Sequence, residues 1–154
     1  MAGQVLPPVD ICDYIILDIY YDTRDGYKKI DYEFLKGQTG NSKLMFTLPQ
    51  GSSRSPNVTL YTRRQIVNQQ TFKNTARLLY TDMNVRGFGI LHFQYGSPTT
   101  IRNCAPNLLA LYQALDSSLV DAGYQEMTNF FSVYLPYTMT NKQIYTEFLS
   151  SLNG

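Results

Sequence analysis

The sequence has few residues of several kinds, and each shortage excludes a class of function. It has no Trp, one His and two Cys among its 154 residues, and only 16% of the residues are charged. A zinc site needs three or four Cys, His or acidic ligands at recognisable spacings. Cys12 and Cys104 lie far apart in the sequence, and neither belongs to a Cys-x-x-Cys motif. We therefore expect no metal, no cofactor and two free thiols.

Long apolar runs are also absent. A bilayer-spanning helix needs about 20 consecutive apolar residues, and no stretch of this sequence comes near that length. Residues 1–4 carry no basic segment of the kind that opens a secretory leader. The sequence thus predicts a protein without a membrane span or a secretion signal.

Catalytic motifs are missing as well. No Gly-x-Ser-x-Gly sequence is present, and neither cysteine lies in a recognised nucleophile motif. Residues 37–43 are glycine-rich but lack the spacing of a phosphate-binding loop. The single imidazole, His92, lies in a strand-like stretch without an acidic partner motif, so we interpret it as a structural residue. We expect no catalytic residues and no enzymatic activity.

Aromatic residues are abundant by contrast, with thirteen Tyr and eight Phe. A soluble monomer usually carries more charge than this chain. Low charge together with many tyrosines is typical of surfaces that contact other proteins. The alternative is that the tyrosines are ordinary strand residues with a solvated hydroxyl.

Charge is divided unevenly along the chain, although the net charge is only +1. Residues 1–33 are acidic, residues 34–86 are strongly basic, and residues 87–154 are mildly acidic. Such blocks indicate head-to-tail self-association or an anionic partner such as DNA for the basic block, unless they neutralise each other within one fold. The candidate contact residues are Asp18, Asp22, Arg63, Arg64, Lys73, Arg77 and Arg86.

The chain is long enough for a single domain over residues 1–154. We expect a proline-containing N-terminal arm at 1–9 and a mobile or partner-binding loop at 49–56. Isoleucines at i, i+4 and i+8 favour a helix over 11–21. A β-hairpin that continues into 27–35 through Asp25-Gly26 is the alternative, because the residues are β-branched and aromatic.

The rest of the chain predicts an α+β fold with a mostly antiparallel sheet. The expected strands are 43–48, 57–67, 75–85, 88–95 and an edge strand at 131–137. Leu108, Leu111, Leu115 and Leu119 form a stripe at helical spacing. An amphipathic helix over about 103–122, ended by Gly123, should therefore pack across one face of the sheet. A short C-terminal helix over 141–152 follows.

This order of elements supports a family resemblance. A proline-bearing loop precedes the Pro56–Tyr61 segment, a hairpin ends in Ile90–Gly96, and a helix and the Phe131–Tyr137 strand follow. The arrangement resembles small tailed-phage proteins of the tail-terminator and neck (head–tail joining) type. The resemblance implies a homomeric, typically hexameric ring that terminates the tail tube and joins it to the head connector.

The same resemblance implies a structural virion protein that assembles in the host cytoplasm and carries no catalytic residues. Its partners would be copies of itself and other neck or tail proteins, with DNA close by in the lumen of the ring. One alternative is another virion part, such as a connector, baseplate or decoration subunit. The other alternative is a small-ligand-binding or enzymatic α+β domain.

Overall fold

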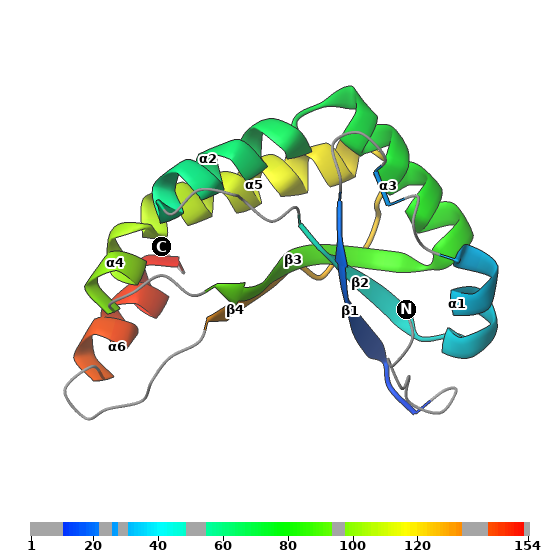
Figure 1. Ribbon diagram of the computed structural model, residues 1–154, viewed down its shortest axis with the longest axis horizontal. Coiled ribbons are helices and arrows are strands. Elements are labelled where there is room, and N and C mark those ends of the chain that lie inside the picture. The colour runs from blue at the N-terminus through cyan, green and yellow to red at the C-terminus, as the bar shows by residue number, and fades with distance from the viewer. Residues whose placement is uncertain are drawn as a thin grey trace.

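The computed structural model describes residues 11–21, 26–27, 31–48, 55–93, 98–133 and 142–152. Strands and helices alternate along these residues (Figure 1). In chain order they are β1 (Tyr14–Tyr20), α1 (Tyr32–Thr39), β2 (Lys43–Thr47), α2 (Pro56–Val67), α3 (Gln70–Met83), β3 (Val85–Phe93), α4 (Pro98–Asn103), α5 (Ala105–Asp121), β4 (Phe130–Val133) and α6 (Lys142–Leu152).

The four strands form one sheet in the order β1-β2-β3-β4, and every neighbouring pair is parallel. The fold is therefore α/β with a Rossmann-like alternation of strands and helices, and the expected α+β fold with a mostly antiparallel sheet is wrong. Parallel neighbours need a crossover of a dozen or more residues, which is usually helical. Helices occupy all three crossovers of this sheet.

The predicted antiparallel sheet is wrong partly because two of its expected strands are helices. The expected strands at 57–67 and 75–85 lie on α2 and α3. The buried residues of α3 are Phe72, Ala76, Leu79 and Met83. This spacing of three and four residues is that of a helix face. The alternation of apolar and polar residues that predicted a strand extends over only a few positions of the segment.

The first element is also different from its prediction. The helix expected over 11–21 does not form, because 14–20 is a strand parallel to β2. Of the alternative hairpin, 32–35 is helical because α1 begins at Tyr32, and 22–25 and 28–30 lie outside the described residues. Along β1, Ile15 is buried and its neighbour Ile16 is exposed, which is the two-residue period of a strand. A spacing of i, i+4 and i+8 fits both periods, so it cannot distinguish a helix from a strand.

Other predicted elements are confirmed. The strand expected at 43–48 is β2, and the helices expected at about 103–122 and 141–152 are α5 and α6. The leucine stripe of α5 is buried. Gly123 follows α5 with a φ of +94°, the left-handed conformation expected of it. The strand expected at 88–95 overlaps β3, and β4 lies at an edge of the sheet as expected.

The helices α2, α3 and α5 lie together along one side of the sheet (Figure 1). Each connection steps the same way across the sheet, and right-handed crossovers then place their helices on one face. Ring contacts join the layers: Phe72 of α3 lies 5.4 Å from Phe88 of β3, between ring centroids. Phe131 of β4 lies 6.1 Å from Phe148 of α6 in the same way.

Two glycines let β4 approach β3 closely. A Cβ on Gly89 would overlap the carbonyl oxygen of Phe130, and a Cβ on Gly87 would overlap that of Thr128. The Asn129 side chain joins the layers here: its Oδ1 accepts from the Phe88 N–H at 3.1 Å, and its Nδ2 donates to the Asp116 carboxylate of α5. This edge of the sheet is therefore held by short backbone and side-chain contacts.

The N-terminal arm and the loop at 49–56 that the sequence predicts fall mostly on residues that the structure does not describe. The arm at 1–9 and residues 49–54 of the expected loop lie outside the described residues. The last two residues of that loop belong to a helix start, because Ser55 is the N-cap of α2 and Pro56 its first residue. Proline is favourable there, since the first turn of a helix does not use its N–H.

Candidate functional site

The usual ligand site of an open parallel sheet lies outside the carboxyl ends of the strands, where the strand order reverses. The described strands follow one another in chain order, so no reversal occurs among them. The segments after the strand ends include 22–25, 49–54, 94–97 and 134–141, which lie outside the described residues. The candidate surface among the described residues lies instead at β1 and at the amino ends of β1 and β2.

We define the β1 outer strip as the side chains of Tyr14, Ile16 and Asp18. They alternate with the buried Ile15 and Leu17 and point to the side of β1 that the helices do not cover. Tyr14 is 41% exposed and Ile16 is 43% exposed. Parallel sheets normally have both faces covered, and an exposed apolar edge strand is a pairing site for another chain. The strip is thus a candidate contact surface.

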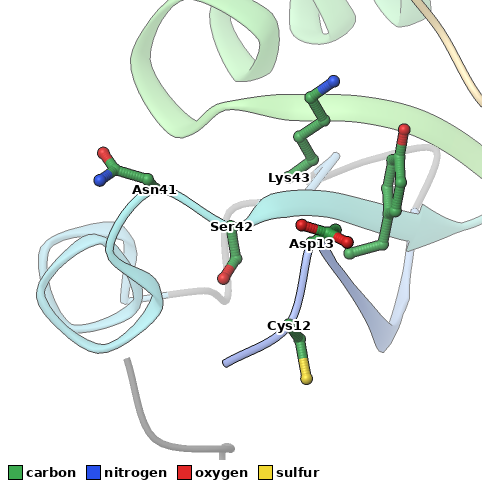
Figure 2. A pocket seen from close by; sticks show the side chains of 6 residues that line it. Cys12, Asp13, Asn41, Ser42 and Lys43 are labelled. Atoms are coloured by element: carbon green, nitrogen blue, oxygen red, sulfur yellow. The ribbon is translucent and has the colours of Figure 1, made fainter. Parts of the chain in front are cut away.

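A pocket adjoins this strip at the amino ends of the two strands (Figure 2). It is lined by Cys12, Asp13, Tyr14, Asn41, Ser42 and Lys43. The Lys43 N–H donates to the Asp13 carbonyl at 2.9 Å and so closes the start of the β1–β2 ladder. Asn84, which has a left-handed φ of 55°, donates from its side chain to the carbonyls of Asn41 and Ser42 at 3.2 and 3.1 Å.

The pocket side chains do not converge on one point. In Figure 2 the Lys43 amine and the Cys12 sulfur point to opposite sides of the strands. The Lys43 Nζ lies 5.6 Å from the centroid of the Tyr14 ring and 3.6 Å from Glu126 Oε2. Its positive charge therefore lies between Tyr14 and Glu126 rather than beside the thiol, and the pocket offers no paired nucleophile and base.

Two of the predicted contact residues stabilise a helix end inside the chain. The Lys73 Nζ is 2.7 Å from an Asp121 carboxylate oxygen. The Arg77 guanidinium donates to the carbonyls of Asp121 and Ala122 at 3.2 and 3.4 Å. These carbonyls belong to the C-terminal end of α5, where the helix dipole favours positive charge. Lys73 and Arg77 of the basic block therefore stabilise the fold through contacts within the chain.

The remaining predicted contact residues are not gathered on one surface. Arg86 donates to the Tyr80 carbonyl at 2.9 Å, and its guanidinium lies 4.0 Å from the Tyr80 ring centroid. Arg63 is only 6% exposed, whereas its neighbour Arg64 is exposed on α2. Asp18 belongs to the β1 outer strip, and Asp22 lies outside the described residues. Contact of these residues with a second copy or with DNA stays a prediction.

Partial or full burial raises the pKa of Tyr112, Asp116 and Cys104, and the first two have hydrogen-bond partners. Burial raises the pKa of the Tyr112 hydroxyl, which donates to the Phe130 carbonyl at the start of β4. Burial also raises the pKa of the Asp116 carboxyl, although the hydrogen bond from Asn129 opposes this. The Cys104 thiol is free, and burial raises its pKa, which makes it a poor nucleophile. The His92 side chain lies outside the described part of the chain, so its interpretation stays a prediction.

Among the described residues, no group of three or more His, Cys, Asp and Glu side chains is placed to hold a metal ion. Their helices include none that is long and apolar enough to cross a bilayer. No family model matches the chain, and no curated protein or solved structure matches it either. A functional proposal must therefore come from the residues themselves.

Sequence reasoning missed the β1 outer strip. It favoured a helix over 11–21, on which Ile16 would point away from Tyr14 and Asp18, and it kept a hairpin only as the alternative. The available signal was the composition of 14–20, which is β-branched and aromatic and therefore favours a strand. To predict that Ile16 is exposed, one must also know that the crossover helices all lie on the other face of the sheet. No local sequence pattern contains that information.

Proposed function

We propose that this chain is a structural subunit that assembles with copies of itself through β1. The observation that carries the proposal is the exposure of Tyr14 and Ile16 on an edge strand of a parallel sheet. Burying such apolar surface contributes roughly 25 cal/mol per Å². Low charge and abundant tyrosine in the whole sequence support the same proposal, because they are typical of protein contact surfaces.

The narrower hypothesis of a ring at a phage neck remains a hypothesis. The resemblance behind it uses 57–61 as a strand and 75–95 as a hairpin, and the first of these segments and 75–83 of the second are helical in this fold. Self-assembly depends on neither segment. The support for self-assembly comes from β1. A ring, a dimer or another assembly of the same chain would each agree with the proposal.

The test is the mass of the purified chain in solution as a function of concentration, measured by light scattering and native mass spectrometry. We expect an oligomer that dissociates on dilution. Ile16→Thr keeps a β-branched residue but makes it polar, and it should shift dissociation to higher concentration. Val120→Thr is the matched control, because Val120 is 61% exposed on α5.

Each outcome has a clear consequence. Weakening by Ile16→Thr with no effect of Val120→Thr supports assembly through β1. Equal effects of the two variants would contradict the choice of β1. A wild-type chain that stays monomeric at all accessible concentrations would overturn the proposed function.

A further inference from the structure

The unpaired edge of β1 invites a specific partner strand. Among the described strands β1 has one neighbour, β2, so the backbone groups on its other side have no partner strand there. The strand β1 is regular over Tyr14–Leu17, its register with β2 shifts between Leu17 and Tyr20, and its outward side chains Tyr14 and Ile16 are exposed. Such an edge is a template for strand addition. We infer that this edge pairs antiparallel with β1 of a second copy about a two-fold axis at Ile16, an inference that rests on the proposed self-assembly.

The position of the axis follows from charge. With Ile16 opposite itself, Tyr14 of one copy lies opposite Asp18 of the other. Tyr14 is also the register partner of Lys43 on β2 within its own copy, and the Lys43 Nζ lies 5.6 Å from the Tyr14 ring centroid. The arriving Asp18 carboxylate therefore lies across Tyr14 from the Lys43 ammonium, which is also 3.6 Å from Glu126 Oε2 of its own copy. The two-fold axis repeats this pair at the other end of the strand.

Neighbouring registers lack this complementarity. An axis at Ile15 would place Asp18 opposite Cys12 of the other copy and leave Lys43 facing Ile16. An axis at Leu17 would place Asp18 opposite Ile16 and leave Lys43 facing Tyr20. A shift by one residue in either direction therefore loses the attraction.

The same register joins the two cores. Opposite residues of an antiparallel pair point to the same face of the sheet. With the axis at Ile16, Ile15 lies opposite Leu17 of the other copy, and both side chains belong to the buried core. The result is one eight-stranded sheet in which both sets of helices lie on the same side. The outer strips of the two copies then form a continuous surface centred on the two Ile16 side chains.

Disulfide trapping tests the register. In a Cys12→Ser background, Ile16→Cys should cross-link to itself under mild oxidation, because opposite residues have Cα atoms about 4.5–5.5 Å apart, within disulfide range. Tyr14→Cys alone should cross-link far less, since it lies opposite Asp18. The double variant Tyr14→Cys with Asp18→Cys should restore cross-linking. The remaining Cys104 is buried in the core and is present in every variant compared.

Charge exchange provides a second readout that does not need a disulfide. The exchange is made in a Glu126→Gln background, because Glu126 Oε2 lies 3.6 Å from the Lys43 Nζ within the same copy. There Asp18→Lys and Lys43→Asp should each raise the dissociation constant about tenfold, because each replaces two symmetric attractions with repulsions. The combined variant should return close to the value of the Glu126→Gln background. Raising the salt from 0.1 M to 1 M should weaken the wild type, since screening shortens from about 10 Å to about 3 Å. Circular dichroism melts identify any variant that has lost its fold.

The outcomes separate this inference from the proposed function. Efficient Ile16→Cys trapping with rescue by the charge exchange supports the β1–β1 pair. An oligomer in which Ile16→Cys is trapped no better than Tyr14→Cys, and in which the charge exchange gives no rescue, overturns the pair but leaves self-assembly standing. A chain that is monomeric throughout overturns both.

Discussion

The two edge strands of the sheet, β4 and β1, differ in how many of their groups are packed or hydrogen-bonded by the chain itself. At β4, Gly89 admits the Phe130 carbonyl, Asn129 binds both β3 and α5, and Tyr112 donates to Phe130. At β1, the outer strip leaves Tyr14 and Ile16 exposed, and Asp18 has no bond to a described residue. The chain itself therefore bonds and packs the β4 edge, whereas it leaves the outward side of β1 exposed, and this is the side to which we assign assembly.

The strongest way to break this comparison is to disrupt the β4 edge. Gly89→Ala should lower the free energy of unfolding by about 3 kcal/mol, because the added methyl overlaps the Phe130 carbonyl and displaces β4 from β3. Urea unfolding at a concentration where the chain is monomeric measures this loss.

The control for that change is Gly37→Ala on α1. No atom lies within 4 Å of the position where its Cβ would be added. Alanine is the better helix former, so this variant should gain about 0.5–1 kcal/mol. If both variants had the same small effect, the close approach of β4 to Gly89 would be contradicted.

A smaller effect is expected from the hydroxyl that anchors the same edge. Tyr112→Phe removes the donor to the Phe130 carbonyl and leaves that acceptor without this partner, at a cost of about 1–2 kcal/mol. Tyr61→Phe is the control, because Tyr61 is 60% exposed on α2 and its change should stay within about 0.5 kcal/mol. Thermal melts of the two variants, compared with the wild type, would expose an error if Tyr61→Phe proved the more costly.

The two edges also show what the sequence could and could not predict. The helix α5 was predicted because its leucine stripe has only one periodic interpretation and Gly123 marks its end. The strand β1 was not, since isoleucines four apart fit a helix and a strand equally well. The parallel sheet was missed for a further reason. The polar and apolar residues of α2 and α3 alternate over a few positions, so these segments were predicted as strands. Without two helices between β2 and β3, the sequence offered no crossover that would make these strands parallel.

The candidate site was predicted even less well, because charge was used as the guide. Lys73 and Arg77 look like surface binding residues in the sequence, but they bond to the end of α5, which lies more than forty positions away along the chain. Arg63 is buried for the same kind of reason, since its helix face turns toward the core. Such roles depend on which elements pack together, and the sequence pattern carries that information only when the topology is known.

Stability should respond far less to substitution on the outward side of β1 than on its inward side or at β4. Ile16→Thr should change the free energy of unfolding of the monomer by no more than about 0.5 kcal/mol, because the side chain is largely solvated in the single chain. The adjacent Ile15→Thr should cost about 2 kcal/mol or more, since it places a hydroxyl in the core. Equal losses in urea unfolding would show that β1 is covered on both faces and would remove the contrast between the edges.

The smallest expected effect is a pH dependence at the β4 edge. Burial raises the pKa of the Asp116 carboxyl above its ordinary value of 3.8. The folded chain then binds this proton more tightly than the unfolded chain, so the contribution to stability is complete below the unfolded pKa and is lost as the pH rises through the folded pKa. Asp116→Asn keeps an oxygen that accepts from Asn129 but does not titrate. Relative to the wild type, this variant should therefore gain stability as the pH rises above 3.8 and then level off. A difference between the two unfolding curves that is constant with pH, or that grows toward low pH, would show that Asp116 is better solvated than its packing against Asn129 implies.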